Sequence, residues 1–311
     1  MIEDFPHTVV IAPKNFHEEL LRELGGIVET HGDLVISNNS AVGCAWAQDV
    51  WLNPVRLSFK SISEAARLLR GLGKHWALYS VANHRRAALI QSELKKTAIP
   101  SRILFPKTLE LPPIGAWTLL SPNVILASSK RWKMFPHGAM EFEENKVFPP
   151  NRAYLKLWEV FTLFGEKPGK GDLCLDFGSS PGGWTWVLQS LGADVVSVDK
   201  ADLVPRIRNL PRVTHLRESA FGLDPKRFPK TDWFFSDVIC YPERLYNLVQ
   251  SWLKVGSCRN FVCTVKLQGD TDFEAIRKFK AIPNSQLLHL YHNKHELTWI
   301  YPARPSLQIR G

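Results

Sequence analysis

Residues 173–184, which read LCLDFGSSPGGW, combine a short apolar strand, a glycine-rich loop and the start of a helix. The strand runs to Asp176, and the loop contains Gly178, Gly182 and Gly183. Glycines allow sharp turns and close approach to a ligand, and open α/β sheets bind ligands at the carboxyl ends of their strands. The stretch therefore predicts an α/β sheet with a nucleoside-containing cofactor at this loop. A tight turn without any ligand would use the same residues.

The spacing of the glycines separates this loop from two common nucleotide motifs. Ser179, Ser180 and Pro181 interrupt the GxGxxG pattern of dinucleotide sites, and no GK[ST] follows to bind phosphate, so NAD and ATP are disfavoured. The next strand, DVVSVDK, ends in Asp199, whose carboxylate is placed to accept hydrogen bonds from a ribose diol. The alternative for Asp199 is a helix or turn cap. Asp176 is expected near the amino-acid part of the cofactor.

After Asn151 long helical patterns alternate with buried strands, which predicts a doubly wound, Rossmann-like α/β sheet. The last two strands, QLLHLYH and ELTWIYP, follow one another without a helix-length gap. One of them is therefore expected to insert antiparallel.

The region before this sheet has a different pattern. HTVVIAP predicts a strand and FHEELLRELGG a helix, and the strands and helices that follow up to about residue 96 suggest an α+β domain of ferredoxin-like kind. Residues 97–150 are rich in proline and aromatic residues, which predicts irregular backbone or edge strands in a connector. We expect an N-terminal α+β domain over residues 1–145, which includes this connector, and a Rossmann-like domain over residues 146–311.

Composition limits the class of protein. The 311 residues are 45% hydrophobic and 22% charged, as in ordinary globular proteins, and no run of about 18 apolar residues predicts a membrane span. The N-terminus lacks the features of a secretory signal, so the cytoplasm is the expected location. Five scattered cysteines without a CxxC pair are expected to be reduced and structural. The net charge of +9 favours a polyanionic partner such as RNA.

Residues 176–184, DFGSSPGGW, fit the pattern D-x-G-x-x-P-G-G-W, and the chain resembles the FtsJ-type RNA ribose 2′-O-methyltransferases. NRAYLKLWEVF, WFFSDVICYPERL, FVCTVKL and LYHNKHELT extend the resemblance, in the same order, over residues 151–301. Within the family it is strongest to members that methylate large-subunit ribosomal RNA and carry an N-terminal THUMP-type region. The resemblance implies S-adenosylmethionine as cofactor. The binding residues it implies are Asp176, Gly178, Ser179, Ser180, Pro181, Gly182, Gly183, Trp184, Asp199, Ser219 and Asp237.

The resemblance also implies a catalytic tetrad of Lys156, Asp237, Lys266 and Glu296. The sequence also supports Asp237 and Lys266 independently of the resemblance, because each follows an apolar strand run at the edge where such sheets bind ligands. A ribose hydroxyl is a poor nucleophile, and a lysine whose pKa is lowered by burial and neighbours can assist its deprotonation. We expect Lys266 to activate the hydroxyl, Asp237 and Lys156 to tune it and position the ribose, and Glu296 to orient a lysine. Taken singly, each is more often a surface charge or a cap.

Ser219 departs from the family, which often has an acid near the adenine at this point, and Glu218 precedes it. Basic residues beside aromatic or other basic residues are candidate RNA contacts, since cations bind phosphates and aromatic rings stack on bases. They are Lys130, Arg131, Trp132 and Lys133, then His84, Arg85 and Arg86, and finally Arg206, Arg208 and Arg212. His75, His289 and His292 lack the spacing of a metal site, so no metal is expected.

The sequence thus predicts an S-adenosylmethionine-dependent methyltransferase acting on RNA, with ribosomal RNA as the expected substrate. The same chemistry on another RNA, such as a transfer RNA, is one alternative. A non-catalytic RNA-binding or assembly factor that has kept the fold is another, and a dehydrogenase is disfavoured by the glycine spacing. The sequence does not give the oligomeric state.

Overall fold

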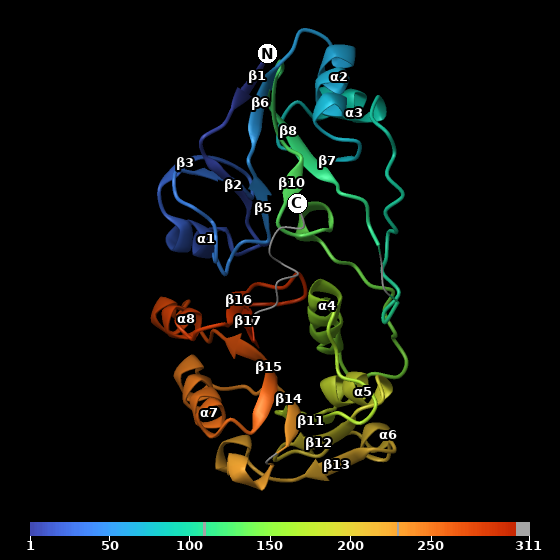
Figure 1. The fold of residues 1–311 in the computed structure, drawn as a ribbon, viewed down its shortest axis with the longest axis vertical. Coiled ribbons are helices and arrows are strands. Elements are labelled where there is room, and N and C mark those ends of the chain that lie inside the picture. Colours follow the sequence, from blue (N-terminus) through green and yellow to red (C-terminus); the bar gives the residue numbers. More distant parts are fainter. Residues whose placement is uncertain (108–109, 229, 303–311) are drawn as a thin grey trace. The chain divides into compact units, whose positions relative to one another are not determined.

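The computed structural model describes residues 1–107, 110–228 and 230–302 (Figure 1). The chain divides into two compact units, one comprising Met1–Glu141 and the other beginning at Phe142. Within the described residues the first unit contains two five-stranded sheets and the second contains one seven-stranded sheet. None of the helices in this part of the chain has the length and apolarity needed to cross a bilayer.

The first sheet of the N-terminal unit has the strand order β10-β5-β2-β4-β3, with every neighbouring pair antiparallel. Helix α1 (His17–Leu24) connects β2 to β3. The strands are β2 (Thr8–Ile11), β3 (Ile27–His31), β4 (Leu34–Ser37), β5 (Asp49–Leu52) and β10 (Lys130–Arg131). The run β2-α1-β3-β4-β5 is a β-α-β-β-α-β motif in which turns and bends over residues 38–48 stand where the second helix would be. The ferredoxin-like prediction fits this sheet apart from that helix.

The second sheet of this unit, β1-β6-β9-β8-β7, corrects one prediction. Residues 97–150 are not an irregular connector throughout, because Gly115–Ser121 (β8) and Val124–Ser128 (β9) form a central, largely buried hairpin. The prolines that suggested irregular backbone lie outside these strands, at Pro113 and in the turn at Pro122. The remaining elements are β1 (Ile2–Asp4), β6 (Val55–Ser58), β7 (Trp76–Leu78), and the helices α2 (Ile62–Leu72) and α3 (His84–Ser92), which share an apolar core with the sheet.

The sheet of the second unit has the order β13-β12-β11-β14-β15-β17-β16. The strands are β11 (Leu173–Phe177), β12 (Asp194–Val198), β13 (Val213–Leu216), β14 (Thr231–Ser236), β15 (Cys258–Lys266), β16 (Gln286–Leu288) and β17 (Glu296–Tyr301). The first five strands in this order are parallel, and β17 lies antiparallel between β15 and β16. Both the doubly wound sheet and its antiparallel strand are therefore confirmed.

The order of the strands fixes where a ligand can bind. From β11 the chain adds β12 and then β13 toward one edge, and afterwards it returns to add β14 and β15 on the other side of β11. The carboxyl ends of β11 and β14 therefore lie beside each other at a topological switch point, where open α/β sheets form their ligand crevice.

Four main helices flank this sheet, with α4 (Tyr154–Phe164) and α5 (Gly183–Ser190) on one side and α7 (Pro242–Val255) and α8 (Phe273–Lys280) on the other (Figure 1). Ten of the eleven residues of α4 are buried, including two charged ones, Lys156 and Glu159. A helix buried on nearly all sides is apolar by default, and a buried charge needs a partner. These two residues therefore point to specific polar contacts around α4.

Candidate active site

Four charged residues from four elements meet at the carboxyl end of the parallel strands. Lys156 lies in the first turn of α4, Asp237 directly follows β14, and Lys266 is the last residue of β15. Glu296 is the first residue of β17 and is the cross-strand partner of Lys266. Because β17 runs antiparallel to β15, its beginning lies at the edge where β15 ends. The sheet register and the packing of α4 thus bring together residues that are up to 140 positions apart in sequence.

The four side chains form a closed ring of alternating charge. Lys156 Nζ donates to Asp237 Oδ1 at 2.7 Å and to Glu296 Oε1 at 3.1 Å. Lys266 Nζ donates to the same Asp237 Oδ1 at 2.7 Å and to Glu296 Oε2 at 3.0 Å. The exposed fractions of the side chains lie between 7% for Lys156 and 17% for Asp237 and Lys266. Each ammonium contacts both carboxylates, so the ring is neutral and all its charges are compensated.

The ring sets the protonation of its members. Burial disfavours the charge of Asp237, but the ammonium groups of Lys156 and Lys266 outweigh burial and lower its pKa. Burial also disfavours the charge of Lys266, yet Asp237 and Glu296 prevail and raise its pKa. The expectation of a lysine whose pKa is lowered by burial and neighbours is therefore wrong for Lys266 in this state. The reason is that its neighbours are two carboxylates held within hydrogen-bond distance.

The glycine loop after β11 lies directly against this ring. Gly178 has a φ of +74°, and a Cβ on it would come within 2.5 Å of the Cα of Val238, the residue after Asp237. Gly183 has no room for a side chain either, because a Cβ there would lie 2.2 Å from Asn151 Oδ1. Close packing of the loop thus accounts for these two glycines, and the same packing places the loop beside the acid of the ring.

Asp176 is fully buried at the end of β11. Its Oδ2 accepts a 2.6 Å hydrogen bond from Thr185 Oγ1, which also lies 2.7 Å from Ser197 Oγ. Its Oδ1 has no hydrogen-bond partner within the described part of the protein, and neither has the buried Ser179 Oγ in the loop. Burial raises the pKa of Asp176 to about 7, and the charges of Asp237 and Asp199 add to this rise. A buried carboxylate oxygen without a partner marks a place for a cationic donor such as an α-ammonium group.

Asp199 is the residue that fastens the loop to the next strand. Its Oδ2 accepts from the backbone N–H of Ser180 at 3.0 Å, and its Oδ1 accepts from that of Ala201 at 2.9 Å. The turn role that the sequence left open is therefore present. Each carboxylate oxygen can accept more than one hydrogen bond, so the carboxylate keeps capacity for a ribose diol.

The remaining loop residues have mainly structural contacts. Trp184 is buried, and its indole Nε1 donates to the carbonyl oxygen of Ala153 at 2.9 Å, while Lys156 Nζ lies 5.6 Å from the centre of the ring system. The carbonyl oxygen of Pro181 accepts from the backbone N–H of Val204. Ser219 lies just after β13 in a half-buried position, and the preceding Glu218 is paired with Arg227.

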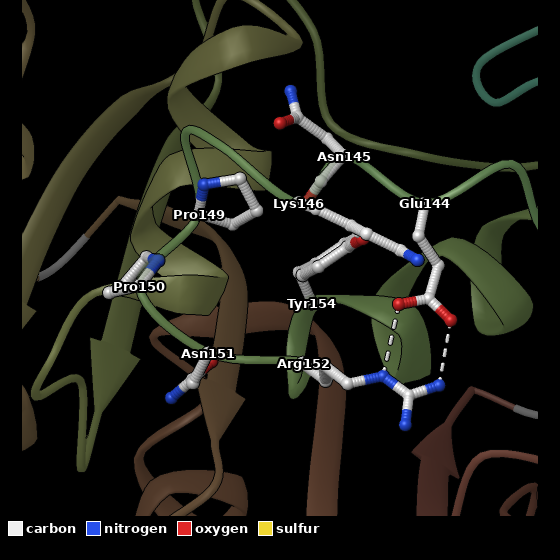
Figure 2. Close-up of a pocket in the computed structure, with 8 residues that line it drawn as sticks. All are labelled: Glu144, Asn145, Lys146, Pro149, Pro150, Asn151, Arg152 and Tyr154. Carbon is white, nitrogen blue, oxygen red and sulfur yellow. Dashed lines mark hydrogen bonds and ion pairs between the residues drawn. The ribbon is translucent and has the colours of Figure 1, made fainter.

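A hollow of about 510 Å³ opens beside the first turn of α4 (Figure 2). It is lined by Glu144, Asn145, Lys146, Pro149, Pro150, Asn151, Arg152 and Tyr154. Glu144 and Arg152 form a two-pronged ion pair across it, with oxygen–nitrogen distances of 2.7 and 3.0 Å. The sequence analysis does not single out this hollow, whose walls combine prolines with the charged residues Glu144, Lys146 and Arg152.

Two of the candidate RNA contacts are wrong. The Arg131 side chain is 2% exposed and pairs with the buried Asp49 at 2.8 Å, and Lys133 is 1% exposed. Arg131 and Lys133 thus serve a buried acid of the first unit and not a phosphate, whereas Lys130 is exposed and Trp132 is half-buried, and both remain candidate RNA contacts. His84 and Arg85 are exposed, whereas Arg86 donates to Asn123.

The arginines of the second unit are exposed but have contacts within the protein. Arg206 donates to the carbonyl oxygen of Phe148, Arg208 pairs with Asp202, and Arg212 donates to the carbonyl oxygen of Gln189. They remain candidate RNA contacts. His75 and His289 lie within hydrogen-bond distance of Thr97 Oγ1 and the carbonyl oxygen of Lys294. Across the described residues no three His, Cys, Asp or Glu side chains cluster as metal ligands would.

Residues 149–287 match the family model of FtsJ-like methyltransferases. This range contains the glycine loop and Lys156, Asp237 and Lys266, and it ends before Glu296. Comparison with curated proteins gives relatives named Ribosomal RNA large subunit methyltransferase M (RlmM). The one from Aromatoleum aromaticum is 32% identical over 172 residues, which cover 50% of this chain and 46% of the relative. The one from Alkalilimnicola ehrlichii is 31% identical over 217 residues, 64% of this chain and 59% of the relative.

A third relative of that name, from Xylella fastidiosa, is 34% identical over 196 residues, which cover 58% of this chain and 55% of the relative. The chain therefore spans about half the length of the curated relatives it matches. The resemblance to the FtsJ-type methyltransferases is confirmed by the family match over residues 149–287. Over residues 149–287 the chain is similar to the FtsJ-like methyltransferases.

Proposed function

We propose that the protein transfers a methyl group from S-adenosylmethionine to a ribose 2′-hydroxyl of RNA. The closed ring of Lys156, Asp237, Lys266 and Glu296 beside the glycine loop carries this proposal. A network of two lysines and two carboxylates can orient a hydroxyl group, and when one lysine is neutral it can accept the proton of that group and return to the fully compensated state.

The cofactor site is formed by the loop and the ends of β11 and β12. The residues present fit S-adenosylmethionine, because the unpartnered Asp176 Oδ1 suits its ammonium group and Asp199 retains capacity for its ribose hydroxyls. Ser219 follows β13 and is available to the adenine. When bound, the cofactor supplies an electrophilic methyl group on a sulfonium.

The tetrad prepares the nucleophile. Lys266 and Lys156 would orient the ribose hydroxyl, and Lys266 would take up its proton when the methyl group passes from sulfur to oxygen, so that the sulfur–carbon bond breaks as the carbon–oxygen bond forms. To accept that proton, Lys266 must first be neutral. Asp237 and Glu296 raise its pKa, so the reaction is expected to accelerate with rising pH.

Large-subunit ribosomal RNA is the proposed substrate, because the relatives that share the domain bear that name and the chain carries a net charge of +9. The N-terminal unit is proposed to bind this RNA, and the cytoplasm is the proposed location. The same chemistry on a transfer RNA, and an assembly factor without catalysis, are the competing functions.

The decisive experiment is a methyl-transfer assay with ribosomal RNA, ribosomal particles and transfer RNA as separate substrates, run on wild type and Lys266→Ala. Wild type is expected to label ribosomal RNA, and Lys266→Ala should lose at least about a hundredfold in rate while binding S-adenosylmethionine as wild type does. Lys254→Ala, on the exposed surface of α7, is the matched control and should behave as wild type.

Calorimetric titration of S-adenosylmethionine separates the competing functions. Binding and catalysis on transfer RNA alone would replace the substrate but keep the chemistry. Absence of both binding and methyl transfer in wild type, with RNA present, would favour the assembly factor.

A further inference from the structure

We infer that Glu159 is a positioning residue that fastens the loop carrying Glu296 to helix α4, and thereby sets the geometry of the catalytic ring. This inference rests on the proposed function. It concerns a residue that lies outside the tetrad and that no sequence motif singles out.

Glu159 is fully buried, and both of its carboxylate oxygens bind the same loop. Oε1 accepts from the backbone N–H of Tyr291 at 2.7 Å, and Oε2 accepts from that of His292 at 3.0 Å. Two successive backbone donors, one on each oxygen, fix a loop in both position and orientation, and hydrogen bonds to a carboxylate are stronger than those between neutral groups.

The loop passes this constraint on to Glu296. The amide Nδ2 of the buried Asn293 donates to the carbonyl oxygen of Glu296 and to Thr298 Oγ1, both at 3.1 Å. The backbone N–H of Glu296 donates to the carbonyl oxygen of Lys294 at 2.8 Å. The backbone of Glu296 is thus held by the residues that directly follow the two fixed by Glu159.

These contacts begin at Glu159 on α4 and lead back to Lys156 on the same helix. Glu296 accepts from Lys156, and Lys156 stands three residues before Glu159, which places both side chains on the same face of α4. Helix α4 therefore holds Glu296 at two points, directly through Lys156 and indirectly through Glu159. A loop released from Glu159 would allow Glu296 to move away from both lysines.

The test compares Glu159→Gln with wild type in methyl transfer. Glutamine keeps the shape but replaces one acceptor oxygen with an NH₂ group, which cannot accept a hydrogen bond from a backbone N–H. We expect kcat to fall roughly ten- to hundredfold, because small misplacements of catalytic groups have effects of this size, while the KM for S-adenosylmethionine stays unchanged.

The pH profile separates positioning from simple destabilisation. Lys266 contacts the carboxylates of Asp237 and Glu296 directly. Lys156 contacts the same carboxylates from the other side, and the thiol of Cys240, in the loop after β14, interacts electrostatically with Lys266. If Glu296 withdraws, Lys266 loses part of the negative charge that raises its pKa, so the alkaline rise in kcat should move to lower pH. A change in melting temperature alone would not move that rise.

Asp232→Asn is the matched control. Asp232 also accepts a backbone N–H, from Leu173 at 2.9 Å, but it lies at the opposite end of β14 from the ring. It should lower the melting temperature without shifting the pH profile. Asn293→Ala removes the side chain that holds the backbone of Glu296, and it should change kcat and the pH profile as Glu159→Gln does. If Glu159→Gln does not fold, Asn293→Ala tests the positioning role alone.

If wild type is active and both Glu159→Gln and Asn293→Ala keep its kcat per folded molecule and its pH profile, the positioning role is wrong and the proposed function stands. If wild type itself transfers no methyl group to any RNA, the proposed function fails first.

Discussion

At the scale of single residues, the protonation of the tetrad depends on contacts between distant parts of the chain. The tetrad could be named from its motifs, but its protonation could not, because the pKa of Lys266 depends on two carboxylates that the sheet register brings within 3.0 Å. Glu159 shows the same limit. Its side chain sits in an apolar helix pattern, and its two partners lie 132 and 133 residues further along the chain.

Asp176 is the residue at which stability and function are expected to oppose each other. Its raised pKa, about 7 against an ordinary 3.8, means that ionisation destabilises the folded cofactor-free protein. The penalty develops as pH rises from about 4 to 7 and is complete above that range. Asp176→Asn, which does not titrate, should therefore be more stable than wild type at pH 8 by on the order of 2 kcal/mol.

Melting curves at about pH 5 and pH 8 test this expectation, since the advantage of Asp176→Asn should shrink at the lower pH. The same variant should bind S-adenosylmethionine at least about tenfold more weakly in calorimetry, because the ammonium group loses its carboxylate. An equal stability difference at both pH values would show that Asp176 is not strained by its charge in the folded state.

At the scale of elements, the hydrophobic pattern of the sequence predicts the strands of the second unit and only part of those of the first. Strands such as LCLDF and NFVCTV are apolar runs bounded by glycine or charge, so their positions followed from composition. The sequence does not predict the β8-β9 hairpin, because prolines flank its strands. The structure shows these strands paired with β6 and β7. Hydrophobic pattern thus predicts buried parallel strands well and hairpins flanked by proline poorly.

The extended segment after β14 supports a prediction about RNA. Cys240 and Pro242 are buried, whereas Ile239 is 80% and Tyr241 68% exposed, within four residues of Asp237. Exposed aromatic and apolar side chains beside a reaction centre can stack on an unpaired base, so Tyr241→Ala is expected to raise the KM for RNA about tenfold and leave binding of S-adenosylmethionine unchanged. Val255→Ala, an exposed apolar residue at the far end of α7, is the control, and equal KM values for the two variants would rule out this contact.

At the scale of the whole molecule, the division into two units suggests a division of labour between binding and chemistry. All four tetrad residues and the glycine loop lie in the unit that begins at Phe142, so cofactor binding is expected to need no residue of the first unit. The positive charge is distributed more widely, with His84 and Arg85 exposed on α3 of the first unit and Arg206, Arg208 and Arg212 exposed on the second. RNA affinity is therefore expected to depend on both units.

Residues 142–311 expressed alone test this division. The fragment should bind S-adenosylmethionine with the affinity of the full chain but show a higher KM for RNA. Because each neutralised phosphate releases counterions, the logarithm of RNA affinity should fall linearly with the logarithm of salt concentration, and the slope should be shallower for the fragment by roughly one for each phosphate that the first unit neutralises in the full chain. Identical slopes for fragment and full chain would assign all neutralised phosphates to the catalytic unit and leave the N-terminal sheets without a role in binding the RNA backbone.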